Sequence, residues 1–221
     1  LYPVASILDP RYTFSVSKKQ TAAGAADAIN HVIEQYFCAT RSDLTDGMCE
    51  SVIRSLIKNA KIALEHPDDE GARGEFMVDC SLACNGILSV GNSPSGWPCH
   101  GMEHALSAYY DITHGEGLAI LTPRWMHHIL SPGTAERFVS FGTHIFGIPS
   151  NLPGWEIAER TIDALVDLFT SFGMPMHLRD VGIDETRLAE MAHHIAENEG
   201  LDAAWVPLSE ADILSILRAS L

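Results

Sequence analysis

The sequence predicts a single all-α domain of about nine helices. Apolar residues recur at helical spacing through most of the chain, and no alternating pattern long enough for a strand follows residue 16. Capping residues, glycines and prolines separate these periodic segments. With 221 residues, of which 46% are hydrophobic, the chain can bury a sizeable core.

Composition and charge exclude several classes of function. The formal net charge of −15 argues against nucleic acid or an anionic membrane as a partner, since both require basic surfaces. No apolar run approaches the length of a bilayer span, and no secretory signal is visible. The five cysteines are odd in number and include no Cys-x-x-Cys pair, so a reduced, cytoplasmic setting is the simplest account.

The N-terminal half is predicted to contain an irregular arm followed by three helices. Residues 1–16 have no helical periodicity, and the absence of an initial methionine indicates a piece of a longer protein. Ser17 and Gln20 form a candidate capping box for the first helix, and Asp46 is expected to cap the second. The three expected helices cover residues 21–38, 47–65 and 69–90.

The C-terminal half is predicted to contain the remaining helices, after a loop at 91–96. Thr113, with Glu116 three residues later, forms a second candidate capping box, and Ser209 is expected to cap the last helix. The expected helices are one through His100 and His104, then 114–130, about 131–146, 155–172, 184–198 and 209–219.

Two groups of polar residues stand out among these apolar helices. Asp27 and His31 are four residues apart, so both project from one face of the first helix. His100 and His104 share a helix face in the same way, and His114 falls in the first turn of the next helix. Two helices that meet at a tight corner can aim His114 and one of the other two histidines at a common point.

These residues have a metal-site interpretation and a simpler one. Neutral imidazole is the commonest protein metal ligand, and such a site also needs a carboxylate. Paired histidines on a helix are often only polar residues on a hydrated face. Asp27 with His31 alone equally fits a hydrogen-bonded pair, and spacing does not choose between His100 and His104 as a ligand.

The tandem of the two spaced motifs is far more specific than either motif alone. The pattern D-x3-H followed by H-x3-H-x9-H, together with Leu8-Asp9-Pro10 and the segments 20–27 and 114–123, resembles the iron-containing (group III) alcohol dehydrogenases. The similarity is closest to the butanol-dehydrogenase branch and spans essentially the whole chain. It implies the helical C-terminal domain of the iron-containing alcohol dehydrogenase and dehydroquinate synthase-like fold.

This resemblance implies a domain organisation and a set of site residues. Residues 1–16 would be an arm from a missing N-terminal nucleotide-binding domain, and residues 17–221 the metal-binding domain. The implied metal ligands, listed in chain order, are Asp27, His31, His100 and His114. His104 would lie beside the metal without binding it and is the candidate catalytic residue, either relaying the hydroxyl proton or ordering the site.

The resemblance also implies cofactors. The family name indicates Fe²⁺, although a site with three histidines and one aspartate would hold Zn²⁺ more tightly, and another divalent ion is a further alternative. NAD or NADP would be bound mainly by the missing domain, since this chain contains no glycine-rich phosphate-binding loop.

The predicted function is that of an NAD(P)-dependent alcohol dehydrogenase that interconverts alcohols and aldehydes. This chain would be its metal-binding half and inactive without the N-terminal domain. The expected partners are a small alcohol or aldehyde and further copies of the chain in a homo-oligomer, not nucleic acid or membrane. The alternatives are a non-catalytic metal-binding helical domain and a metal phosphohydrolase, which is disfavoured because no His-Asp dipeptide occurs.

Overall fold

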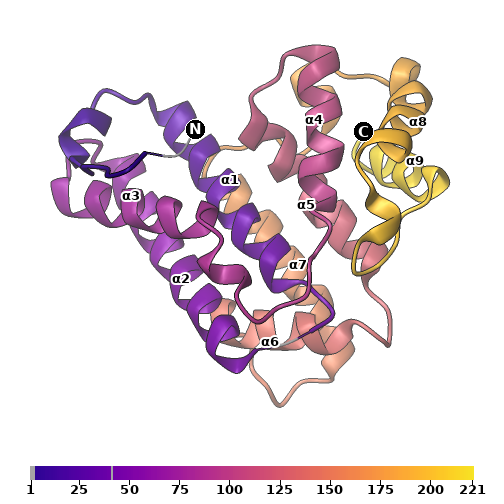
Figure 1. The fold of residues 1–221 in the computed structure, drawn as a ribbon, viewed down its shortest axis with the longest axis horizontal. Helices are drawn as coiled ribbons and strands as arrows, with labels where there is room; N and C mark the ends of the chain where they lie inside the picture. Colours follow the sequence, from indigo (N-terminus) through magenta and orange to yellow (C-terminus); the bar gives the residue numbers. More distant parts are fainter. Residues whose placement is uncertain (1–2, 41) are drawn as a thin grey trace.

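The computed structural model describes residues 3–40 and 42–221, and this part of the chain contains nine α-helices and no β-strand (Figure 1). The α-helices are α1 (Lys18–Tyr36), α2 (Asp43–Glu65), α3 (Glu70–Cys84), α4 (Pro98–Tyr110), α5 (His114–Ile129), α6 (Ala135–Phe146), α7 (Gly154–Ser171), α8 (Leu188–Asn198) and α9 (Glu210–Ala219). Short 3₁₀ helices are η1 (Pro10–Thr13), η2 (Ile87–Ser89), η3 (Leu178–Val181), η4 (Glu185–Arg187) and η5 (Leu201–Ala203). The all-α prediction is confirmed, while the expectation for Leu1 and Tyr2 lies outside the described residues.

Helix α1 is the centre of the arrangement. It packs against α2, α3 and α5, and Figure 1 shows it running between the α2–α3 pair and the α4–α5 pair. Helices α6 and α7 pack against each other, and α8 and α9 pair and contact α4 and α5, respectively. The buried alanines of α1 let its neighbours approach closely; they are Ala22, Ala23, Ala25, Ala26 and Ala28.

The crossing of α1 and α5 depends on Gly115. A Cβ at this position would lie 2.0 Å from the carbonyl oxygen of Ala23, so only glycine allows the backbones to come this close. Ala23 precedes Asp27 by one helical turn. The first turn of α5, which contains His114, therefore lies next to Asp27.

Asp46 is not the helix cap that the sequence predicts. Helix α2 begins about one turn earlier, where the Oγ of Ser42 accepts the N–H of Thr45. Asp46 is instead buried within α2, and its Oδ1 accepts a hydrogen bond from Nη2 of Arg137 in α6 at 2.8 Å. The same guanidinium donates from Nε to the carbonyl oxygen of Tyr36 at 2.9 Å, so one arginine joins α6 to α1 and α2.

The other predicted caps have mixed outcomes. Ser17 and Ser209 accept capping hydrogen bonds at the starts of α1 and α9, as expected. Of the capping box predicted for Ser17 and Gln20, the described residues show only the Ser17 half. Thr113 precedes α5 as predicted, but its side chain makes no capping bond. The predicted capping box is wrong, because the carboxylate of Glu116 pairs with Lys19 at 2.9 Å instead of reaching back to Thr113.

One predicted helix is too long. Helix α3 ends at Cys84 and not at residue 90, because Gly86 adopts a left-handed φ of 85° and leads into η2. The remaining helix ends fall within about one turn of their predicted positions. No described helix combines the length and the apolar composition that crossing a bilayer requires.

Candidate metal centre

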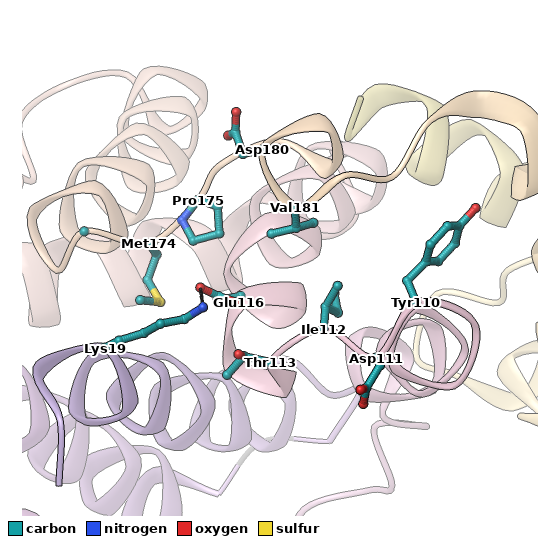
Figure 2. Close-up of a pocket in the computed structure, with 11 residues that line it drawn as sticks. Lys19, Tyr110, Asp111, Ile112, Thr113, Glu116, Met174, Pro175, Asp180 and Val181 are labelled. Carbon is teal, nitrogen blue, oxygen red and sulfur yellow. Dashed lines mark ion pairs between the residues drawn. The ribbon is translucent and has the colours of Figure 1, made fainter.

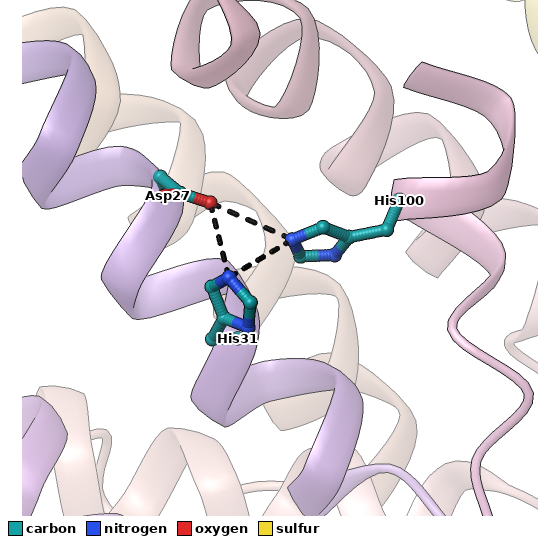
Figure 3. A group of neighbouring side chains, drawn as sticks. All are labelled: Asp27, His31 and His100. Carbon is teal, nitrogen blue, oxygen red and sulfur yellow. Dashed lines mark hydrogen bonds and ion pairs between the residues drawn. The ribbon is translucent and has the colours of Figure 1, made fainter. Parts of the chain in front are cut away.

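Side chains from three helices converge beside the middle of α1. The Oδ1 of Asp27 lies 3.4 Å from Nε2 of His31 and 3.5 Å from Nε2 of His100, and the two Nε2 atoms are 3.3 Å apart (Figure 3). His114, in the first turn of α5, places its Nε2 3.6 Å from the same oxygen. The structure therefore places His31, His100 and His114 around Asp27, and these are the four residues that the resemblance implies as ligands.

These distances fit a divalent ion. Ligands about 2.1 Å from a tetrahedral ion stand about 3.4 Å from one another, and the three separations among Asp27, His31 and His100 run from 3.3 to 3.5 Å. His114 approaches this group through Asp27, at 3.6 Å. The Oδ1 of Asp27 is buried and accepts no hydrogen bond from any described residue. An orphaned carboxylate oxygen facing three imidazole nitrogens is costly unless it shares a cation with them.

His104 lies next to this cluster but outside it. Its side chain is 58% exposed, and its ring stacks on that of His114 with centroids 5.9 Å apart and an interplanar angle of 19°. Its Nδ1 is 3.7 Å from Oε2 of Glu199. Of the two histidines that share one face of α4, only His100 turns its Nε2 toward Asp27.

Two buried glutamates contact the histidines, and sequence spacing alone does not reveal them. Glu34 of α1 accepts a hydrogen bond from Nδ1 of His100, and Glu103 of α4 accepts one from Nδ1 of His114. Both glutamates are fully buried. The available sequence signal is weak: each follows a predicted ligand, His31 or His100, by three residues in an otherwise apolar helix.

The pKa values of the clustered side chains are shifted in different directions. Burial, followed by the neighbouring His100, lowers the pKa of His31 to about 4. Burial also lowers the pKa of His100, but the carboxylates of Asp27 and Glu34 outweigh it and raise that pKa to about 9. The hydrogen bond to its buried glutamate raises the pKa of His114. Burial raises the pKa of Asp27, yet the three imidazoles outweigh this effect and lower it, so Asp27 is ionised at neutral pH.

Trp97 forms one wall of the cluster. It precedes α4 with a φ of 50°, a left-handed conformation that is uncommon for residues other than glycine. Its ring lies edge-on to two of the imidazoles, with centroids 5.3 Å from His31 and 5.2 Å from His100. The indole is partly exposed, so it borders the open side of the site.

A hollow of about 560 Å³ opens at the corner between α4 and α5 (Figure 2). It lies between the start of α1 and the loop after α7, and the ion pair of Lys19 with Glu116 crosses it. None of the four clustered residues lines this pocket. Its chemistry is therefore separate from that of the candidate metal centre.

Comparison with known proteins identifies the family. The sequence profile of the Fe-containing alcohol dehydrogenase family, C-terminal, matches residues 21–221. This chain belongs to that family. The NADH-dependent butanol dehydrogenase A of Clostridium acetobutylicum is 46% identical to it over 220 residues, which are 99% of this chain and 56% of the relative.

Two further comparisons identify the same family. The probable NADH-dependent butanol dehydrogenase 1 of Bacillus subtilis is 38% identical over 223 residues, covering 100% of this chain and 57% of the relative. The crystal structure of NADH-dependent butanol dehydrogenase A from Thermotoga maritima matches with a TM-score of 0.92 at 33% identity, over 99% of this chain and 56% of that chain. The family and the fold predicted from the sequence are thus confirmed, and the chain spans about 56% of the length of these relatives.

Proposed function

We propose that this chain is the metal-binding part of an NAD(P)-dependent alcohol dehydrogenase that interconverts small primary alcohols and aldehydes. The observation that carries the proposal is the convergence of one carboxylate oxygen and three imidazole nitrogens from α1, α4 and α5. Family membership supports the reaction class. The names of the relatives, which are NADH-dependent butanol dehydrogenases, support the choice of substrate and of a nicotinamide cofactor.

Each residue of the cluster has a role in this proposal. Asp27, His31, His100 and His114 would hold the ion, which is Fe²⁺ by family and Zn²⁺ as the more tightly bound alternative. Asp27 contributes the negative charge that offsets the charge of the cation. When bound, the ion supplies a Lewis acid for the substrate oxygen.

His104 is the residue proposed to move the proton. Its exposed ring borders the cluster, and the hydroxyl proton of an alcohol can pass through it between the substrate and water. Hydride exchange with the nicotinamide requires a nucleotide-binding domain. We assign the metal domain to residues 17–221 and the connecting arm to residues 1–16.

The experiment uses the full-length protein that contains this chain. Its metal content is determined, and NADH oxidation is followed with butanal as the substrate. Wild type and Asp163→Ala, which changes an exposed carboxylate on α7, should contain metal and reduce butanal. Asp27→Ala should lose both properties, because it removes a ligand and the carboxylate that faces the Nε2 atoms of all three imidazoles.

Two results would contradict the proposal. Retention of metal and activity by Asp27→Ala would move the site elsewhere. A wild-type protein that binds metal through this cluster but never turns over alcohols or aldehydes would favour the non-catalytic metal-binding domain.

A further inference from the structure

We infer that Glu34 and Glu103 are positioning residues, which fix the rings of His100 and His114 and hold α4 and α5 in register with α1. The inference rests on the proposed function, because it concerns residues that support the same cluster. It assigns a role to two fully buried carboxylates that contact no substrate and belong to none of the spaced motifs.

Glu34 connects α1 to the first turn of α4. Its Oε2 accepts from Nδ1 of His100, and its Oε1 accepts from the backbone N–H of Cys99 at 2.6 Å. That N–H is one of the first-turn amides that have no partner inside a helix, and Trp97 at the N-cap offers no side-chain acceptor. A buried carboxylate from another helix therefore caps α4 and orients a histidine one residue later.

Glu103 makes the corresponding connection from α4 to α5. Its Oε2 accepts from Nδ1 of His114, and its Oε1 accepts from the hydroxyl of Ser107 at 2.5 Å. Gly117 provides the space for this carboxylate, since a Cβ there would lie 2.7 Å from Cγ and 2.8 Å from Oε1 of Glu103. The glutamate is thus enclosed between two helices, with a hydrogen bond at each carboxylate oxygen.

The two contacts determine which nitrogen each imidazole presents. A histidine that donates from Nδ1 to a carboxylate turns the lone pair of Nε2 outward and becomes a stronger donor to a metal. In both His100 and His114, that Nε2 is the atom that faces Asp27. The glutamates therefore set the tautomer as well as the direction of the rings.

His31 is the one proposed histidine ligand that no glutamate contacts among the described residues. The Nδ1 of His31 is buried and has no hydrogen-bond partner among the residues that the structure describes. His31 shares α1 with Asp27, so helix geometry alone fixes the distance between them. His100 and His114 come from other helices and need a separate connection, and these are the two histidines that have one.

The test is the affinity for Zn²⁺, measured by competition with a chromogenic chelator in the full-length protein. Glu34→Gln and Glu103→Gln should each weaken binding by roughly 10- to 100-fold. Glu103→Ala should weaken it further than Glu103→Gln, because glutamine can still accept a hydrogen bond from Nδ1. Glu116→Gln is the matched control. This largely buried glutamate on α5 pairs with Lys19 and has no hydrogen bond or ion pair with a histidine among the described residues, so the Zn²⁺ affinity of the variant should stay at the wild-type level.

A second readout and a milder variant keep the test decisive. Replacing Zn²⁺ by Co²⁺ should give a visible spectrum that changes in the Glu34 and Glu103 variants but not in Glu116→Gln. Ser107→Ala removes only one support of Glu103 and should weaken Zn²⁺ binding less than Glu103→Gln, which preserves the test if larger changes prevent folding. The inference would be overturned if Glu34→Gln, Glu103→Gln and Ser107→Ala all kept the wild-type Zn²⁺ affinity and Co²⁺ spectrum. A wild-type protein that binds no metal would instead overturn the proposed function.

Discussion

At the scale of single residues, α4 holds two histidines, one turn apart, in contrasting environments. The side chain of His100 is 8% exposed and bonded to Glu34, whereas that of His104 is 58% exposed and stacked on His114. Loss of the first removes a proposed ligand, and loss of the second leaves all four donor atoms in place. Substitution of His100 should therefore reduce metal binding, whereas substitution of His104 should reduce turnover alone.

His104→Ala in the full-length enzyme is expected to retain metal at the wild-type level and to lower turnover by roughly 10²- to 10⁴-fold, the usual loss of general acid–base assistance. His114→Ala should lose the metal, because a direct donor is removed. Metal analysis and steady-state kinetics on the same preparations measure both effects.

His104→Phe is the matched control, because phenylalanine preserves a ring on His114 but cannot transfer a proton. It should have the kinetics of His104→Ala. A metal-free His104→Ala, together with a His100→Ala that keeps its ion, would mean that the roles of the two histidines are reversed.

The sequence predicts the residues of the site better than it predicts their supports. Helical spacing places Asp27 and His31 together, since their contact is local. The choice between His100 and His104 depends on which turn of α4 lies beside α1, and it is the first turn that contacts Glu34 of α1. Residues 34 and 100 approach only when the chain has folded, so spacing could not reveal this contact.

At the scale of the helices, the α1–α5 crossing determines where His114 lies. Gly115→Ala would place a Cβ 2.0 Å from the backbone oxygen of Ala23, which cannot rotate away. We expect the variant to be destabilised by about 1–3 kcal/mol or more and to bind metal more weakly, because α5 must move. Urea unfolding with excess chelator measures the first effect, and metal titration measures the second.

Gly24 of α1 is the control for Gly115, since a Cβ there would meet no atom within 4 Å. Gly24→Ala should increase the free energy of unfolding by up to about 1 kcal/mol through helix propensity alone. Equal stability of Gly115→Ala and Gly24→Ala would show that the crossing tolerates a side chain.

The buried pair of Asp46 with Arg137 is expected to contribute more to stability than the cap that begins α2. Asp46→Ala leaves the guanidinium of Arg137, which is 4% exposed, without this partner, and should cost about 3–5 kcal/mol. Ser42→Ala removes only a capping oxygen and should cost about 1 kcal/mol. Urea denaturation compares them, and a larger loss for Ser42→Ala would contradict this ranking.

This pair also shows why some helix boundaries are predictable and others are not. Ser17 and Ser209 cap their helices as predicted. Near α2, Ser42 and Asp46 are equally good local candidates. Asp46 is not the cap because it bonds to Arg137 instead. Arg137 is 91 residues from Asp46 along the chain, so a local sequence pattern does not predict this bond.

At the scale of the whole molecule, the candidate centre draws its side chains from three packed helices, α1, α4 and α5, of which α1 lies far from the other two in the sequence. A ligand that binds only the folded state adds to its stability, by about 2.7 kcal/mol at a free concentration 100 times its Kd. The thermal midpoint of the wild type should therefore rise with Zn²⁺ and fall with a chelator. Asp27→Ala should show neither response; a Zn²⁺-dependent midpoint in that variant would place the ion at another site.

The N-terminal arm exposes several apolar side chains. Its apolar side chains at Val4, Ile7 and Tyr12 are almost fully exposed in the described chain. The cytoplasmic setting, the homo-oligomer and a nucleotide-binding domain next to this arm stay predictions. Exposed apolar side chains next to the metal domain are what a covering surface of that kind would explain.

The position of Trp97 has an optical consequence. Its indole lies 5.2 and 5.3 Å, centroid to centroid, from the rings of two proposed ligands, so it is a fluorophore at the edge of the coordination sphere. Open-shell Fe²⁺ or Co²⁺ at that range quenches indole emission by energy and electron transfer, whereas closed-shell Zn²⁺ has no low-lying d states with which to do so. The emission of residue 97 therefore reports whether an open-shell ion occupies the centre, and it separates Fe²⁺ or Co²⁺ from Zn²⁺.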